Sequence, residues 1–265
     1  TAVIGGFIFA IIVWFFSRMG RWAPLYCWIG VMIIQVFMTF IGPIIILPLF
    51  NKFTPLEEGE LKKAIDDYAR AENFKINGIF KMDASKRSTK SNAYFTGFGK
   101  YRRIALFDTL IKRHSIEELV SILAHEIGHY KKSHILKNVV LSAVNTGLMF
   151  FILYFFIDNR GLFDAFKMDR LSIYAGIVFF SFLYTPINTI LSIISQYISR
   201  KFEYEADTYA VSTYNNPEAM INALKKLTVD NLINLTPHPA KVFFHYSHPP
   251  VLKRIEAIRE MSKNS

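Results

Sequence analysis

Four long apolar runs limit this chain to a helical fold embedded in a membrane. They cover residues 2–16, 25–50, 135–157 and 171–198. A helix needs about 20 apolar residues to cross the hydrocarbon core of a bilayer, and all but the first run reach that length. Because the bilayer offers no water to backbone polar groups, runs of this kind are expected to be helices. The sequence therefore predicts a mainly α-helical protein with several membrane spans.

The first run is shorter than the others and begins at Thr1, with neither an initiating Met nor a basic leader. A secretory signal peptide would carry a positively charged start and a small-residue cleavage site. We therefore expect this run to be a truncated span and the sequence to begin inside a longer protein.

Basic residues gather in the polar segments between and after the apolar runs. Residues 51–134 carry 16 Lys or Arg against 11 Asp or Glu, and residues 199–265 carry nine against seven. These two segments carry +5 and +2 of the net charge of +10, and this distribution argues against a nucleic-acid partner. The positive-inside rule places both segments on the cytosolic side of a lipid bilayer.

The first polar segment has the pattern of a small α+β domain. We expect Thr54 to cap an amphipathic helix over Glu57–Asn73. The stretches "NGIFKMD", "SNAYFTGFG" and "RRIALFD" are expected to be strands, the second of them followed by a turn. A helix over Ser115–Lys132 should begin with the capping-box pair of Ser115 and Glu118. After residue 198, helices are expected over "ISRKFEYEADTYAVSTY", Pro217–Val229 and Val251–Met261.

The segment "SILAHEIGHYKKSH" places costly polar groups within an apolar helix. His125 and His129 are four residues apart, so both imidazoles share one face, as zinc binding requires. H-E-x-x-H is the zinc-protease signature, in which Glu126 is the general base rather than a ligand. The alternative is a polar helix end. Gly128 argues against that alternative, because a helical glycine costs about 1 kcal/mol relative to Ala unless something must approach the backbone closely.

A catalytic zinc ion needs a third protein ligand and one open position. A third histidine in the pattern H-E-x-x-H-x-x-G-x-x-H is excluded, because Lys132 and Ile135 occupy its glycine and histidine positions. His134 falls one residue short of that position. On a continuous helix it is rotated away from the ligand face, so we expect it at the surface.

The stretch "KFEYEADTYA" offers a carboxylate instead. Glu203 and Asp207 are four residues apart, so Glu203 can bind the metal while Asp207 accepts the free N–H of a ligand histidine. Glu205 points elsewhere and is expected in solvent. The alternative is a charged face balanced by Arg200 and Lys201. The two spans between the motifs return the chain to the side that it left, so the two helices can meet.

The motifs "SNAYFTGFG", "RRIALFDTL", "LAHEIGHY", "FEYEADTYA" and "HYSHPP" occur in this order along the chain. In these motifs the chain resembles the membrane-embedded zinc metallopeptidases of the type I CAAX prenyl protease family, with the heat-shock protease HtpX as a more distant relative. The resemblance covers residues 49–258. It implies a zincin-like (gluzincin) α+β catalytic domain with a small β-sheet and one Zn²⁺ per chain. The implied site residues are the ligands His125, His129 and Glu203, the base Glu126, and Asp207 behind a ligand.

The resemblance also implies two roles outside the zinc motifs: Asn92 and Ala93 hold the substrate backbone, and His248 lies near the oxyanion position. An Asn on an exposed edge strand can pair with an extended peptide, although a turn-capping Asn fits the residues equally well. An imidazolium donor would stabilise the negative oxygen of the tetrahedral intermediate. Spacing alone allows His245 in that role as well.

Seven spans are typical of the family, five of them before the catalytic motif, whereas two are expected here. We therefore expect three N-terminal helices to lie outside this sequence. Four consecutive parts follow: residues 1–50 with two spans, 51–134 with the first part of the catalytic domain, 135–198 with a transmembrane hairpin, and 199–265 with the second catalytic part.

The expected function is that of an integral-membrane zinc metalloendopeptidase acting on prenylated or membrane-associated proteins, in the endoplasmic reticulum membrane or a bacterial inner membrane. An HtpX-like quality-control protease is the alternative within this class. A non-catalytic zinc scaffold is disfavoured, because structural zinc sites usually have four protein ligands and the single cysteine, Cys27, lies in an apolar run. A membrane-surface binding module explains the charge but not the motifs.

Overall fold

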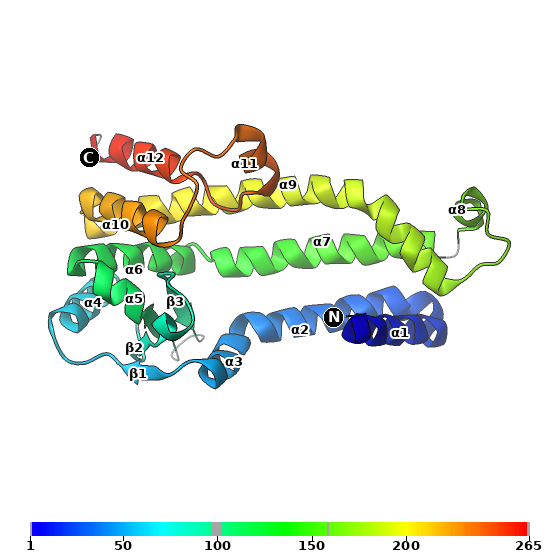
Figure 1. The fold of residues 1–265 in the computed structure, drawn as a ribbon, viewed down its shortest axis with the longest axis horizontal. Helices are drawn as coiled ribbons and strands as arrows, with labels where there is room; N and C mark the ends of the chain where they lie inside the picture. The colour runs from blue at the N-terminus through cyan, green and yellow to red at the C-terminus, as the bar shows by residue number, and fades with distance from the viewer. Residues whose placement is uncertain (1, 97–101, 158, 264–265) are drawn as a thin grey trace. The chain divides into compact units, whose positions relative to one another are not determined.

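The computed structural model describes residues 2–96, 102–157 and 159–263. The turn expected after the strand "SNAYFTGFG" lies outside the described residues. The first half of the chain contains α1 (Ala2–Met19), η1 (Gly20–Trp22), α2 (Ala23–Phe40), α3 (Gly42–Phe50), β1 (Phe53–Pro55), α4 (Glu60–Ala71), β2 (Ile79–Met82), η2 (Ala84–Lys86), β3 (Ala93–Thr96), β4 (Arg103–Phe107), α5 (Asp108–Arg113) and α6 (Ile116–Lys131) (Figure 1). The second half contains α7 (His134–Phe156), α8 (Arg160–Ala165), α9 (Ile173–Tyr214), α10 (Pro217–Asp230), α11 (Pro239–His245) and α12 (Val251–Lys263).

Three stretches of helix are long and apolar enough to cross a membrane: Gly5–Phe40, His134–Phe156 and Ile173–Tyr214. Large apolar side chains on these stretches are mostly exposed. A helix that is apolar on all sides and not covered by protein is typical of a membrane span. The chain divides into two compact units, one formed by Thr1–Val36 with Asn138–Ile194 and the other by Phe37–Lys137 with Ser195–Ser265.

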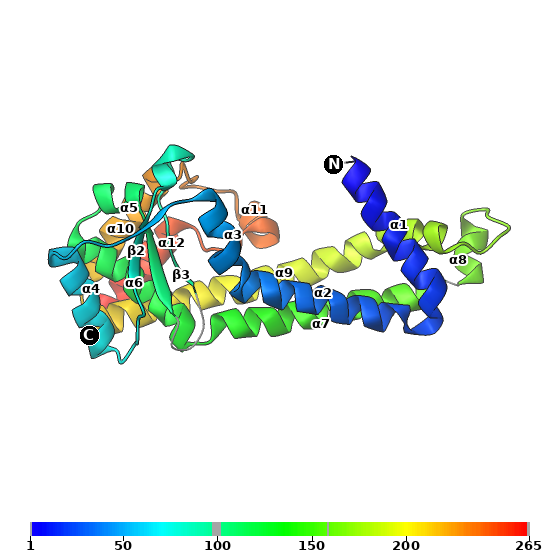
Figure 2. The same ribbon diagram turned by 90° about the horizontal axis from the view of Figure 1, so that it is seen from below.

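The first unit is held together by close contacts between its long helices. Trp28 on α2 donates a hydrogen bond to the carbonyl of Ala143 on α7 over 3.0 Å. Figure 2 shows α2 running along α7. Gly147 lies one turn further along α7, where a β-carbon would come within 3.2 Å of the Trp28 indole nitrogen. Gly20, with a φ of +53°, reverses the chain between α1 and α2. The helices α1, α2, α7 and α9 share an apolar cluster.

The expected single span over residues 25–50 is wrong, because this run forms two helices. α2 ends at Phe40, and α3 begins at Gly42. Pro43 occupies the second position of α3, where its missing N–H costs no hydrogen bond. Pro43 also cannot donate to the carbonyl four residues earlier, that of Thr39 in α2, and its ring crowds that carbonyl. The helix therefore breaks between Phe40 and Gly42. The expected turn at residues 158–170 likewise contains a short helix, α8.

The second unit is built on a four-stranded mixed sheet with the strand order β1-β2-β4-β3. β2 and β4 are parallel, with Ile79 opposite Ile104, and both outer strands are antiparallel to their neighbours. The strands expected at "NGIFKMD" and "RRIALFD" and the first part of "SNAYFTGFG" are thereby confirmed. β3 lies at an edge of the sheet. The sheet packs on one side of α6, while α10 lies on the other side, between α6 and α12 (Figure 1).

Two expected helix starts in this unit have different outcomes. Thr54 does not cap a helix, because it lies in β1 and pairs with Lys81 of β2; α4 begins at Glu60 after Gly59. The capping box of α6 is confirmed. The Ser115 hydroxyl accepts from the Glu118 backbone N–H over 3.3 Å, and the Ser115 N–H donates to the Glu118 carboxylate over 3.1 Å. This cap fixes where the helix that carries the first metal motif begins.

Candidate metal centre

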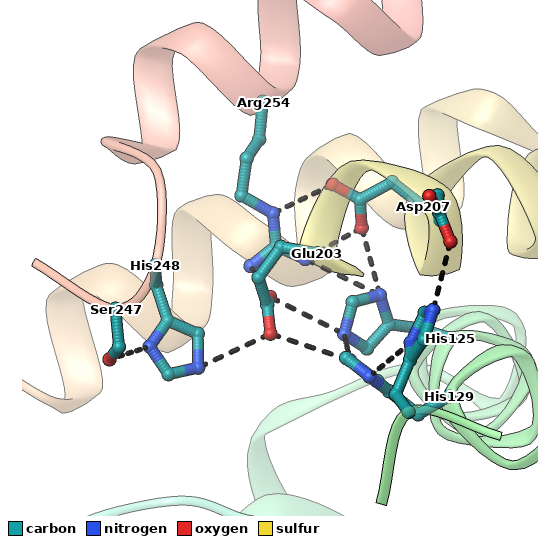
Figure 3. A network of polar contacts seen from close by, with 9 residues as sticks. His125, His129, Glu203, Asp207, Ser247, His248 and Arg254 are labelled. Carbon is teal, nitrogen blue, oxygen red and sulfur yellow. Dashed lines mark hydrogen bonds and ion pairs between the residues drawn. The ribbon is translucent and has the colours of Figure 1, made fainter. Parts of the chain in front are cut away.

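The two histidines of α6 direct their Nε2 atoms at one point (Figure 3). The His125 and His129 Nε2 atoms are 3.1 Å apart. His125 is buried and His129 is partly buried. The helical spacing of four residues therefore brings the imidazoles together, as the sequence predicts.

α9 supplies the third candidate ligand and its support. The Glu203 carboxylate lies 3.6 Å from His125 Nε2 and 3.4 Å from His129 Nε2. Asp207, four residues further along, lies 2.8 Å from His125 Nδ1 through its Oδ1 atom. Both carboxylates are buried, with exposed fractions of 5% and 1%. Among the described residues, His125, His129 and Glu203 form a group whose ligand atoms all lie within 4.8 Å of one another.

α6 and α9 can approach this closely because residue 128 is a glycine. A β-carbon at Gly128 would lie 3.1 Å from the Ala206 carbonyl oxygen and 3.1 Å from the Tyr209 β-carbon. Both neighbours belong to α9, and one is a backbone atom that cannot move without its helix. The close approach expected from a costly helical glycine is therefore present.

Replacing Gly128 with Val should lower the free energy of unfolding by about 1–3 kcal/mol, the usual cost of overpacking a core. Ala should cost less, because it gains about 1 kcal/mol in helix propensity. Denaturant unfolding of the purified chain measures both effects. Gly30→Val is the matched control, since a β-carbon at Gly30 meets nothing within 4 Å. Equal unfolding midpoints for Gly128→Val and the unaltered chain would contradict the role of Gly128.

Arg254 is a member of the site that the sequence analysis did not identify. It extends from α12 and forms a two-pronged ion pair with Asp207, with N–O distances of 2.7 and 2.6 Å (Figure 3). Its Nη1 atom lies 3.1 Å from the Glu203 carboxylate. Paired geometry of this kind is among the stronger interactions in proteins. Arg254 therefore fixes both carboxylates relative to the histidines.

The donor atoms at the centre fit a bound cation. The Nδ1 atom of His125 faces a carboxylate, so we assign its proton to Nδ1 and leave a lone pair on Nε2. The two imidazole Nε2 atoms and the two oxygens of the Glu203 carboxylate then face one another at 3.1–3.6 Å. Lone pairs at this distance repel one another unless a cation lies between them. Two imidazoles and one carboxylate are a known ligand set of catalytic zinc.

Glu126 lies next to this centre without belonging to the ligand group. It lines a cleft of about 760 Å³ together with His125, His129 and Glu203. Burial raises the pKa of the Glu126 carboxyl above its ordinary value. A carboxylate whose pKa is raised in this way is a better proton acceptor than one in water.

His248 reaches the same cleft from the loop before α12. Its Nε2 atom lies 3.3 Å from the Glu203 carboxylate, and its Nδ1 atom lies 2.9 Å from the Ser247 hydroxyl (Figure 3). The side chain is largely exposed. Of the two histidines that spacing allowed, the structure brings His248 into the lining of the cleft, whereas His245 ends α11.

Asn92 and Ala93 also line the cleft, at the start of the edge strand β3. The Asn92 side chain is exposed, and its carbonyl oxygen accepts the N–H of Ala93 over 2.9 Å. The Asn92 backbone carbonyl accepts from Phe107 of β4 over 3.1 Å. Asn92 therefore caps the local backbone and also lies at the start of the edge strand, so both interpretations of this residue fit the structure.

His134 and Glu205 correct two expectations. His134 was expected at the surface, but its exposed fraction is 1%. Glu205 was expected in solvent, but its carboxylate lies 3.0 Å from His134 Nε2. The cause is a break in the helix: α6 ends at Lys131, and Ser133 has a φ of +57°. The rotation assumed for a continuous helix therefore does not apply.

Comparisons with known proteins identify the family of this chain. The family model described as peptidase family M48 matches residues 55–262, and the model described as CAAX prenyl protease N-terminal, five membrane helices, matches residues 1–52. CAAX prenyl protease 1 of Saccharomyces cerevisiae is 35% identical over 276 residues, which cover 98% of this chain and 61% of that protein. The homolog of Homo sapiens is 32% identical, covering 92% of this chain and 60% of that protein. This chain therefore spans about 60% of the length of these relatives.

A solved structure shows the same fold. The crystal structure of S. mikatae Ste24p matches with a TM-score of 0.85 and 35% identity, over 97% of this chain and 63% of that one. Together with the three stretches of helix long enough to span a bilayer, these matches show an integral membrane protein with a Ste24p-like fold. With a family model matched over most of its length, the chain belongs to peptidase family M48.

Proposed function

We propose that this chain carries the catalytic machinery of an integral-membrane zinc metalloendopeptidase that processes the C-termini of CAAX proteins. The observation that supports this proposal is the convergence of the three candidate ligands with Glu126 in one cleft. The family implies a metal. Among the described residues the ligand group has three members, whereas a structural zinc site usually has four. A catalytic centre fits this set better than a scaffold does.

The names of the relatives bear on the substrate. They are CAAX prenyl proteases and their homologs, which favours C-terminal processing over general quality control. We propose prenylated, membrane-associated proteins as substrates. The proposed catalytic domain consists of residues 51–134 and 199–265 on the cytosolic side, with spans in residues 1–50 and 135–198.

A zinc ion bound at this centre would polarise the scissile carbonyl and lower the pKa of water. Glu126 then accepts the proton of the attacking water and delivers it to the leaving amine. Its raised pKa, caused by burial, brings it closer to the pH at which it works. His125, His129 and Glu203 would hold the metal. Asp207 accepts the Nδ1 proton of His125 and so keeps the Nε2 lone pair on the side of the other two ligands.

The remaining residues position the substrate. Among the described strands, β3 has a neighbour on one side only, so an extended peptide could add to its other side as a further strand. Asn92 and Ala93 line the cleft at the start of this strand. His248, in the loop before α12, lines the same cleft with an exposed imidazole. It can donate to the oxygen that becomes negative during attack.

Removal of the metal tests both the reaction and the substrate class. The purified chain should cleave a farnesylated CAAX peptide, lose that activity after treatment with a chelator and regain it when Zn²⁺ is added back. An unmodified peptide of the same sequence should be cleaved more slowly. Mass spectrometry of the products gives the cleavage site and both rates.

Two results would contradict separate parts of this proposal. Hydrolysis that survives complete removal of the metal, or no hydrolysis by the zinc-loaded chain, would rule out the metallopeptidase assignment. Equal rates on the two peptides would rule out prenyl recognition and leave general proteolysis of membrane-associated chains.

A further inference from the structure

A second histidine–carboxylate pair, His134 with Glu205, contacts the candidate ligand His129. His134, the first residue of α7, places its Nδ1 atom 3.0 Å from the Nδ1 atom of His129. Its Nε2 atom lies 3.0 Å from the Glu205 carboxylate. His134 is not a member of the candidate ligand group. His134 therefore contacts the candidate ligand His129 at its Nδ1 atom, whereas the Nε2 atom of His129 faces the other two candidate ligands.

The contacts among His129, His134 and Glu205 determine which ring nitrogen of each histidine carries a proton. If His129 Nε2 presents a lone pair to a cation, the proton of the neutral ring must be on Nδ1. That N–H can donate only if His134 Nδ1 offers a lone pair, which puts the His134 proton on Nε2. This second N–H points at the Glu205 carboxylate, an acceptor. Each ring nitrogen then has a partner of the correct kind.

Packing holds the His134 ring in place. The ring stacks on Phe202 of α9, with centroids 4.2 Å apart and an angle of 9° between the planes. The Lys137 ammonium lies 5.4 Å from the centroid of the same Phe202 ring. With an exposed fraction of 1%, His134 is shielded from water that could replace its hydrogen bonds. A buried polar ring in this position is costly unless both nitrogens are used.

We propose that His134 and Glu205 are positioning residues that fix the tautomer and the orientation of the metal ligand His129. This inference rests on the proposed zinc site. The site would then orient its two imidazoles differently: His125 directly through Asp207, and His129 through His134 and Glu205. Outer partners of this kind typically change metal affinity by about 10- to 100-fold when they are removed.

Zinc affinity, measured by competition with a chromophoric chelator, tests the proposal without relying on turnover. His134→Phe keeps a ring that can stack on Phe202 but removes both nitrogens, and it should weaken Zn²⁺ binding by about 10- to 100-fold. His134→Asn restores an acceptor near His129 and should recover part of that loss. Glu205→Ala should weaken binding more than Glu205→Gln, because Gln keeps an acceptor for His134.

The matched control is His114→Phe. His114 is also buried, with its Nδ1 atom 3.1 Å from the Glu118 carboxylate, but it does not belong to the ligand group. Its replacement should change zinc affinity by less than about twofold, although it too removes a buried histidine. Thermal unfolding of the metal-free variants separates loss of fold from loss of metal affinity.

The possible results separate this inference from the function on which it rests. Failure of the unaltered chain to bind Zn²⁺ would overturn the metal site, and this inference with it. Normal binding by the unaltered chain together with unchanged affinity in His134→Phe would overturn the positioning role alone. Equal losses in His134→Phe and His114→Phe would also overturn it, because the effect would then come from the removal of any buried histidine.

Discussion

Replacing Glu126 with Gln should lower kcat for peptide hydrolysis by about 10²- to 10⁴-fold, the usual contribution of a general base. The amide has nearly the same shape as the carboxylate but cannot accept the proton of water. The candidate ligands are three other side chains, so the zinc content should stay at one ion per chain. Steady-state kinetics on the farnesylated peptide and metal analysis of the same sample measure the two quantities.

Glu117→Gln is the matched control for this change. Glu117 lies on the same helix, α6, with an exposed side chain, and its replacement should leave both quantities unchanged. An active Glu126→Gln enzyme would exclude Glu126 as the base. An inactive enzyme without zinc would instead show that Glu126 supports metal binding.

Much of the candidate site could be predicted because its residues are related by local spacing. His125 and His129 share a face of α6, and Glu203 and Asp207 share a face of α9, by the same separation of four residues. Only one inference joined residues far apart in the chain. Two spans separate the motifs, so both motif helices return to the same side of the membrane and can meet. None of these inferences depends on how side chains pack.

The predictions that failed assumed regular structure where the chain is irregular. The position of His134 was derived for a continuous helix, but Ser133 adopts a positive φ between α6 and α7. Thr54 has the composition of a helix cap, but its backbone is part of a strand pair with Lys81. In the run 25–50, Pro43 is a recognisable signal of a helix break, but the interpretation followed the high apolar content of the run instead.

Arg254 was missed for a different reason, because its partners come from another helix. One signal was present in the sequence. Val251, Ile255 and Ile258 are buried at helical spacing on α12, and Arg254 falls within the same stripe. A charged residue on an apolar face must have a partner when it is buried. That pattern predicts a buried ion pair, but the identity of the partner depends on the tertiary fold.

This placement makes Arg254 the residue whose loss should most affect stability. Its side chain is 9% exposed, and its guanidinium pairs with Asp207, while Nη1 approaches Glu203. Both carboxylates are buried, so removal of the cation leaves two negative charges without their main compensation. Such one-sided removal of a buried ion pair typically costs about 3–5 kcal/mol. The effect should be larger without metal, because bound Zn²⁺ also compensates Glu203.

Arg254→Met, which keeps an apolar stem of similar length, should therefore lower the free energy of unfolding of the metal-free chain by about 3–5 kcal/mol. Denaturant unfolding measures this change. Arg259→Met on the exposed face of α12 is the control and should cost less than about 0.5 kcal/mol. Adding Asp207→Asn to Arg254→Met should recover part of the stability, since the two sites interact directly, but not the zinc affinity, because His125 then lacks its carboxylate. An Arg254→Met chain as stable as the unaltered one would mean that water, rather than Arg254, compensates the two carboxylates.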